Sequence, residues 1–337
     1  MLKQKVAKGN FFILDADRAV AIAKRSMNEG LAFVIMAAGS AADNVQTKWS
    51  TTSVAKYAGL GIPRAKAAID SLMAAGDIER AVQSSVAAPV YTLAPLGARI
   101  AYLPKSIVLG TGTSMPLIKR LRETGDNLAL AFFLELNALQ NLAGDLGLPQ
   151  TICHIRYERR EIGEVDNYRA WAFGGEPEFE APEMPATFSA YFAGGEVEFP
   201  FSRLQTLMNV GAVEWSPYLW ESDALDSEPI TPCVTTIPDC NHPYYELWGA
   251  AFLTTDKILG EEAEERLDEA LADDLAFAVP LHGHKGAVQV RSILRLTHRP
   301  KTKNAAHFAA STRTLANRFV KRMNYLREKV SENTAEK

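Results

Sequence analysis

The sequence has few cysteines and lacks any apolar run long enough to cross a membrane. Its 337 residues include three cysteines, an odd number at low density: Cys153, Cys233 and Cys240. Such usage is unlike a disulfide-stabilised secreted domain and favours a reducing, cytoplasmic setting. The longest apolar run, residues 31–38, is much shorter than the ~20 residues of a transmembrane helix, and residues 11–14 are too short for a signal peptide. We therefore expect a soluble cytoplasmic protein that contacts no membrane.

Motifs of common catalytic and metal sites are missing as well. The sequence has no Gly-x-Ser-x-Gly elbow and no recognisable Cys–His signature. Gly110-x-Gly112 lacks the Gly-Lys-Ser/Thr ending of a phosphate-binding loop, so we interpret it as a linker. Five residues are acceptable zinc ligands at a spacing unlike any common site: Cys233, Cys240, His242, His282 and His284. We expect no enzymatic activity, metal or cofactor; the alternative is a metal-dependent nuclease centred on His282 and His284.

The net charge of −4 conceals an uneven distribution of charge along the chain. Residues 1–100 carry 12 Lys and Arg against 7 Asp and Glu, and residues 285–337 carry 13 against 3. Residues 101–284 carry 11 against 30. Because Lys and Arg supply most non-specific DNA affinity by neutralising phosphates, the basic ends are candidate DNA contacts, and the acidic middle is expected to face away. The alternative is that basic and acidic regions attract one another within the fold or a dimer.

Residues 49–76 have the pattern of two helices joined by a tight turn. Gly59 and Gly61 interrupt the first helix, as a turn with unusual backbone angles would. Pro63 occupies the expected first position of the second helix, and Gly76 is expected to end it in the left-handed conformation. Hydroxyl residues suited to capping open the first helix: Ser50, Thr51, Thr52 and Ser53. Apolar residues at helical spacing form an inward stripe on the second: Ala65, Ala68, Ile69, Leu72 and Met73.

This stretch resembles the helix-turn-helix of bacterial winged-helix and repressor families. The match is carried by Val54-Ala55-x-x-Ala58-Gly59-Leu60 and by Ala65 and Ile69 as inward positions. Residues 77–82 and 90–93, joined by a Ser/Ala loop, resemble the hairpin that these families call the wing. The resemblance covers residues 27–100 and implies that the helix over 63–75 enters the major groove of double-stranded DNA. The sequence departs from the pattern in offering no outward Asn or Gln there, and in placing Ile62-Pro63 at often polar positions.

The resemblance implies a set of DNA contacts, and the basic C-terminal region adds others. Arg64 is expected to read guanine and Ala67 a thymine methyl group. The other candidates in the motif are Ser50, Thr51, Thr52, Ser53, Lys56, Lys66 and Ser71. The C-terminal candidates, several on a predicted basic helix over 305–330, are Arg299, Lys301, Lys303, Arg313, Arg318, Lys321 and Arg322.

The rest of the chain is predicted to complete an α+β, mainly helical protein. Helical patterns cover 27–42 and 115–146, strand patterns cover 151–173 and 212–220, and a short helix ended by glycine lies between them at 201–211. This order repeats that of the first motif and predicts tandem winged-helix units. Beyond them we expect an acidic helix over 261–276 and a strand from about 287 to 296. The predicted parts are an N-terminal extension (1–26), a winged-helix domain (27–100), a second, degenerate winged-helix-like or assembly domain (101–255), and a region with an acidic helix, a strand and a basic C-terminal helix (256–337).

The predicted function is double-stranded DNA binding without catalysis, as a transcriptional regulator. One recognition helix reads only a few base pairs, so we expect a homodimer, formed through the acidic middle region. A plasmid or phage replication initiator, which commonly joins two winged helices in one chain, is the first alternative. A protein-interaction subunit that keeps the helix-turn-helix as a scaffold is the second. The sequence identifies no small-molecule effector.

Overall fold

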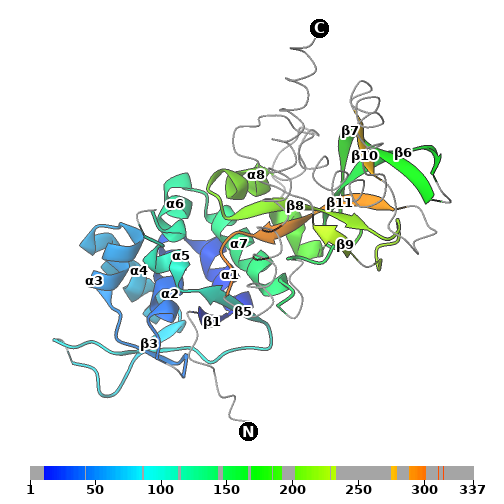
Figure 1. The fold of residues 1–337 in the computed structure, drawn as a ribbon. Helices are drawn as coiled ribbons and strands as arrows, with labels where there is room; N and C mark the ends of the chain where they lie inside the picture. Colours follow the sequence, from blue (N-terminus) through cyan, green and yellow to red (C-terminus); the bar gives the residue numbers. More distant parts are fainter. Residues whose placement is uncertain are drawn as a thin grey trace. The chain divides into compact units, whose positions relative to one another are not determined.

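The structure, a computed structural model, describes residues 11–41, 43–85, 87–112, 115–142, 147–165, 168–183, 185–191, 202–227, 229–232, 275–278 and 288–300, with Ala310 and Thr314. Helices and small antiparallel sheets together make an α+β fold, as expected (Figure 1). The chain forms two compact units. Unit 1 comprises 1–142, 185–214 and 296–305, and unit 2 comprises 143–184, 215–295 and 306–337. Among the described residues, no helix is both long enough and apolar enough to cross a membrane.

Two apolar helices form the centre of unit 1. Helix α2 (Met27–Ala38) is buried on all sides from Gly30 onward, and α7 (Asn127–Leu139) is buried from Ala129 to Asn137. Side chains cap both helices: Ser26 accepts from the Glu29 N–H, and Asp126 accepts from two N–H groups in the first turn of α7. Helix α1 (Ala16–Arg25) packs against both, so it belongs to the same core. These contacts make α2 and α7 the interior against which most helices of unit 1 lie.

Shorter elements surround these helices. Strand β1 (Phe11–Asp15) pairs antiparallel with β5 (Ile100–Pro104). Helices α3 (Thr51–Ala58) and α4 (Ile62–Ala74) pack on α2 and on each other. A three-stranded antiparallel sheet has the order β2-β4-β3, from β2 (Gln46–Thr47), β3 (Ile78–Arg80) and β4 (Tyr91–Leu93). The remaining elements of unit 1 are α5 (Ser106–Leu109), α6 (Leu117–Thr124), the 3-10 helix η1 (Ala186–Tyr191) and α8 (Ser202–Asn209).

Unit 2 is organised around a six-stranded sheet of order β10-β7-β6-β11-β8-β9. Strands β6 (His154–Val165) and β7 (Tyr168–Glu180) form a long hairpin. Strand β11 (Gln289–Leu296) is buried along its whole length and pairs antiparallel with β6. The sheet is completed by β8 (Val213–Trp220), β9 (Pro229–Pro232) and β10 (Leu275–Ala278). Strand β11 therefore joins residues close to the end of the described chain to strands from its middle.

The structure confirms several predicted elements and corrects others. Residues 115–146, expected to be one helical region, form α6 and α7 with a break at Gly125, whose φ of 67° ends α6. The strand pattern expected over 151–173 continues to Glu180, because β6 and β7 make one hairpin. The acidic helix expected over 261–276 lies outside the described residues except at its end, where Leu275 and Ala276 belong to strand β10 instead. The basic helix predicted over 305–330 lies almost wholly outside them.

Candidate nucleic-acid interface

Helices α3 and α4 form the predicted helix-turn-helix. Gly59 ends α3 with a φ of 69°, and its N–H donates to the Ala55 carbonyl. Gly61 does not need the special backbone expected of it, since its φ is −66° and it precedes α4 in an extended conformation. Pro63 is the second residue of α4 and not the first, a position that equally needs no N–H donor. Gly76, with a φ of 72°, follows the end of α4 as predicted.

Helix α4 buries one face and presents the other to solvent. Four residues of the predicted stripe are buried: Ala65, Ala68, Ile69 and Leu72. Met73, the fifth, is half-buried. On the opposite face Arg64, Lys66 and Ala67 are exposed, as the sequence pattern predicts. Lys66 forms an ion pair of 3.6 Å with Asp70 one turn later. Arg64, near the start of the helix, is the other exposed cation on this face.

Trp49 fixes the entry to the motif. Its indole ring stacks on Tyr57 of α3, with ring centroids 4.6 Å apart. The same ring lies against Gly39 at the end of α2, so closely that any Cβ at Gly39 would overlap it. Trp49 is therefore a packing anchor between α2 and α3.

A polar network holds the motif to α1 and α2. The Asp77 carboxylate, which follows α4, accepts from Arg25 at 2.8 Å and from Arg18 at 3.4 Å. Arg25 also donates to Glu29 at 2.6 Å, and Glu29 in turn accepts from the Ser71 hydroxyl at 2.9 Å. The hydrogen bond to Asp77 is the main cause that raises the pKa of Arg25. The two arginines balance the negative charge of the buried Asp77. The bond to Glu29 turns Ser71 toward the body of unit 1.

The start of α3 departs from the capping pattern expected of it. Ser50 occupies the N-cap position but makes no side-chain cap hydrogen bond, contrary to the capping role expected of these hydroxyls. The first N–H groups of a helix have no partner within the helix, and anions bind there. Thr52 and Lys56 are exposed on the same helix, whereas Ser50, Thr51 and Ser53 are half-buried. These residues together form a polar end that carries one lysine.

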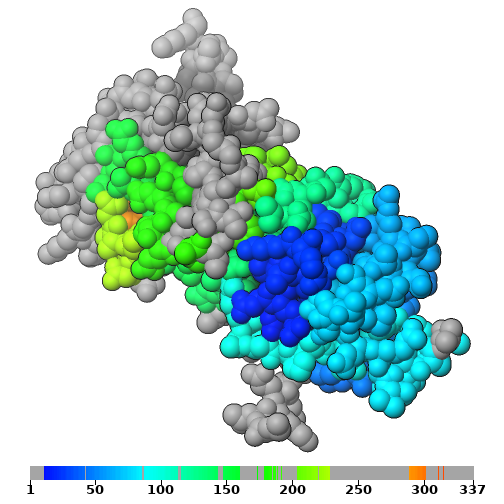
Figure 2. All heavy atoms as spheres, turned by 180° about the vertical axis from the view of Figure 1, so that it is seen from behind, coloured from blue at the N-terminus to red at the C-terminus, as the bar shows by residue number. Residues whose placement is uncertain are grey.

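The hairpin β3–β4 has the predicted position of a wing. Its register pairs Ile78 with Leu93 and Arg80 with Tyr91, and the Gln83 side chain donates to Gln46 of β2 at 3.0 Å. Figure 2 shows this hairpin in cyan, protruding from the body of unit 1. Val82 at the start of the loop is fully exposed, at 103%. The described part of the loop carries no charged residue. Its side chains therefore offer apolar groups and uncharged polar groups to any partner.

Of the seven predicted C-terminal contacts, the structure describes Arg299. Arg299 is half-buried. Desolvation raises the pKa of the Glu214 carboxyl, and the positive charge of Arg299 partly opposes that shift. The other six lie outside the described residues: Lys301, Lys303, Arg313, Arg318, Lys321 and Arg322.

Sequence reasoning missed three cations near the helix-turn-helix. Lys48 precedes α3 and Arg80 lies in β3, and both are exposed. Their positions beside the motif were a usable signal. Arg122 of α6 lies against the turn, where a Cβ at Gly59 would stand 3.7 Å from its guanidinium carbon. Nothing in the local sequence indicates that α6 packs beside α3, so Arg122 could be found only from the fold.

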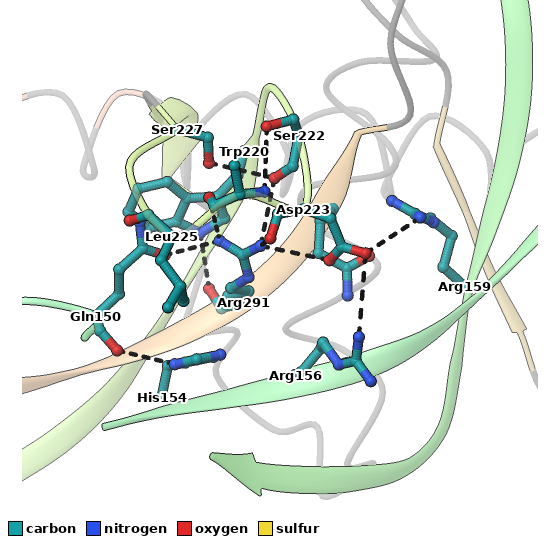
Figure 3. Close-up of polar contacts among 12 residues, drawn as sticks. Gln150, His154, Arg156, Arg159, Trp220, Ser222, Asp223, Leu225, Ser227 and Arg291 are labelled. Carbon is teal, nitrogen blue, oxygen red and sulfur yellow. Dashed lines mark hydrogen bonds and ion pairs between the residues drawn. The ribbon is translucent and has the colours of Figure 1, made fainter. Parts of the chain in front are cut away.

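Unit 2 contains a separate cluster of arginines around Asp223 (Figure 3). Arg291 of β11 and Arg156 of β6 lie opposite each other in the sheet, a repulsive arrangement for like charges. The Asp223 carboxylate offsets it by pairing with Arg291 and Arg159 at 3.3 Å each and with Arg156 at 4.0 Å. Arg291, 1% exposed, also donates to the Ala224 carbonyl and to Gln150. Burial lowers the pKa of Arg291, and Asp223 opposes that shift. The cluster fastens the loop after β8 to the sheet.

Two side chains of types that occur in catalytic and metal sites, Cys153 and His154, are buried in unit 2. His154 is buried, with Nδ1 2.9 Å from the Gln150 carbonyl oxygen and Nε2 3.1 Å from a Glu180 oxygen. Burial is the main cause that lowers its pKa. Burial raises the pKa of the neighbouring Cys153 thiol to about 12. No group of three or more metal-ligand side chains occurs among the described residues, and the candidates Cys233, Cys240, His242, His282 and His284 all lie outside them.

Comparisons with protein-family models, curated proteins and solved structures find no match to this chain.

Proposed function

We propose that the protein binds double-stranded DNA, with α4 as the helix that enters the major groove. The observation that carries the proposal is the α3–turn–α4 arrangement, in which a buried stripe leaves Arg64, Lys66 and Ala67 exposed on one face. Outward residues of such a helix meet base edges, and Arg is the commonest reader of guanine.

The elements around this helix support the same proposal. A helix, a short strand, the two helices and a hairpin follow one another from α2 to β4, and their sheet has the order β2-β4-β3. This is the order of a winged helix, the family that residues 27–100 resemble in sequence. The motif's cations Lys48, Lys56 and Arg80 are exposed, whereas the nearby Asp77 is buried and paired. Phosphate attraction at this face is therefore opposed mainly by Asp70 and Glu79.

The same strand order recurs later in the chain. Helix α7, strand β6, the short helices η1 and α8, strand β8 and strand β11 follow in sequence, and their strands lie in the order β6-β11-β8. Strands β7, β9 and β10 are additions to this order. The recurrence supports tandem winged-helix units, the finer fold that the sequence predicts.

Arg64→Ala and Arg64→Lys test the groove-reading role. DNA fragments captured by the wild-type chain from genomic DNA supply the binding site, and affinity is measured against that site and a scrambled duplex. Arg64→Ala should cost ~1–3 kcal/mol on the captured site and relax its preference at one base. Arg64→Lys keeps the charge but loses the two-pronged guanidinium contact, so it should lose specificity while retaining affinity for scrambled DNA. Unchanged binding by Arg64→Ala would remove α4 from the interface.

Within DNA binding, transcriptional regulation is the role that we propose, and replication initiation is the second candidate. The recurring strand order is the observation that supports this second candidate, because initiators of plasmids and phages commonly join two winged helices in one chain. Genomic capture separates them: a few promoter fragments indicate a regulator, and repeated sites at one origin indicate an initiator. Absence of any enriched fragment would instead favour a protein-interaction subunit.

A further inference from the structure

The end of helix α8 repeats the local structure at the end of α4. After α4, the Asp77 N–H donates to the Leu72 carbonyl and the Gly76 N–H donates to the Met73 carbonyl. After α8, the Ala212 N–H donates to the Leu207 carbonyl and the Gly211 N–H donates to the Met208 carbonyl. Gly76 and Gly211 have φ angles of 72° and 64°. Both helices therefore end in the same left-handed turn, and each turn leads directly into a strand.

The third strand of each set returns to the same point of that turn. The Ala94 N–H, just after β4, donates to the Asp77 carbonyl at 3.1 Å. The Thr297 N–H, just after β11, donates to the Ala212 carbonyl at 3.1 Å. Burial agrees as well: the turn residues Asp77 and Ala212 are both buried, as are the strand residues that follow them, Ile78 and Val213.

Several residues of the first helix-turn-helix recur later in the sequence. The spacing between each residue and its counterpart is constant, with no insertion or deletion. Identical residues begin with Thr52, Ala55, Ala58 and Gly59, which correspond in sequence to Thr187, Ala190, Ala193 and Gly194. They continue at the helix end, where Leu72, Met73 and Gly76 correspond to Leu207, Met208 and Gly211. Shared hydrogen bonds and shared sequence in the same register identify α8 as the counterpart of α4.

The exposed face of α8 carries the base-reading amides that α4 lacks. Leu204 and Leu207 are buried, as are their counterparts Ile69 and Leu72. Gln205 and Asn209 are exposed one turn apart, at the positions of Asp70 and Ala74. The Gln205 amide donates to the Asn209 side-chain oxygen at 2.8 Å, which holds the two side chains together on the outer face. Asn and Gln make two-pronged hydrogen bonds to adenine in the major groove.

Charge around α8 suits DNA, although the middle of the sequence is acidic overall. Helix α8 contains no acidic residue, and α6 has Lys119, Arg120 and Arg122 against one glutamate. Arg120 donates to the Val210 carbonyl at the end of α8, and its other nitrogen lies 3.3 Å from His298. Arg203, within α8, pairs with Asp126 at 3.3 Å. Both ends of α8 are therefore held by arginines.

We propose that α8 is a second major-groove helix, which reads an adenine-containing segment through Gln205 and Asn209. The inference rests on the proposed DNA-binding function and assigns a second reading site to the same chain. Each chain then recognises two short blocks of sequence, one through α4 and one through α8. It also replaces the assembly role that the sequence predicts for this region by direct contact with DNA.

Selection from a randomised duplex library with the full chain tests the proposal. The random segment spans about four helical turns, or roughly 42 base pairs, so that two blocks fit on one duplex. Wild type should select two conserved blocks that differ in sequence, whereas a homodimer that reads through α4 alone would select one block in two copies. Gln205→Ala and Asn209→Ala should each lower affinity for the selected duplex by roughly 5- to 100-fold and remove an adenine preference in one block. Arg64→Ala should relax the other block only.

Matched controls separate a loss of reading from a loss of folding. Both amides are exposed, so the variants should unfold at the wild-type temperature, and Glu183→Gln, an exposed change in unit 2, should bind as wild type. Selection of one kind of block, in one copy or two, or amide variants that bind within twofold of wild type, would overturn the second site while leaving the α4 assignment intact. Equal weakening on selected and random duplexes would also overturn it, because it would assign the amides to phosphate contacts. Absence of any selected sequence for wild type would overturn DNA binding itself, and the second site with it.

Discussion

At the scale of single residues, two glycines of the helix-turn-helix region differ in what fixes them. Gly39 is required by contact, because the Trp49 ring occupies the space that a Cβ would need. Gly61 is not, since a Cβ there would meet only the Pro63 ring at 3.9 Å. Both look alike in the sequence as small residues beside helices.

Gly39→Ala should therefore destabilise the fold, whereas Gly61→Ala should not. The added methyl group at Gly39 forces Trp49 away from Tyr57, and overpacking of this kind costs about 3 kcal/mol. Gly61→Ala should cost less than about 1 kcal/mol, the effect of alanine at an N-cap. Chemical denaturation followed by tryptophan fluorescence measures both. Equal stability of the two variants would contradict the packing role of Trp49.

At the scale of elements, α4 is positioned by hydrogen bonds as well as by its apolar stripe. Asp77 joins the end of α4 to Arg18 and Arg25 of α1, and Ser71 joins α4 to Glu29 of α2. The stripe alone sets which face is buried. The polar network adds a specific distance between α4 and α1, which an apolar surface does not define.

Asp77→Asn should weaken this attachment, and Asp70→Asn is its matched control. Asp77 has a side chain 9% exposed and two arginine partners, and hydrogen bonds to charged groups contribute about 1.5–3 kcal/mol. Asp70, 52% exposed with one lysine partner, should contribute under ~0.5 kcal/mol. Thermal unfolding at one pH compares the two. A control variant as unstable as Asp77→Asn would show that the network does not position α4.

At the scale of the whole chain, charge is distributed by element and not by broad region. The segment 101–284 is strongly acidic, yet α6 and α8 within it each carry a net positive charge. The described acids of this segment include Glu178, Glu180 and Asp223, which are paired with arginines in unit 2. An average over the segment therefore hid two helices of net positive charge.

The basic C-terminal region provides a test of long-range attraction. A triple change of Arg318, Lys321 and Arg322 to Ala should weaken binding to all duplexes about equally. It should also flatten the dependence of log K on log salt by up to ~0.9 per lost phosphate contact. If these charges serve to contact phosphates, their role in folding is small, and the unfolding temperature should be unchanged. A lower unfolding temperature with an unchanged salt slope would mean that this region packs on the acidic part of the chain.

The sequence alone determined the features that depend on neighbouring residues. Helical spacing gave the buried stripe of α4, Gly59 and Gly76 marked two turns that need positive φ, and the apolar alternation near 290 predicted β11. Such features follow from backbone geometry within a few residues, so a local pattern is enough to predict them. Arg64 as an exposed cation on α4 belongs to the same class.

Only the tertiary structure decided what depends on residues far apart in sequence. The strand order β6-β11-β8 brings Arg291 beside Arg156, and the fold lays Arg122 of α6 against Gly59. Likewise, the match between α4 and α8 became evident from the bonds of Ala94 and Thr297 to their turns, since the few identical residues are scattered among many different ones. Hydrogen bonds between distant strands and the packing of helices are set by the free energy of the whole core, and no local pattern specifies them.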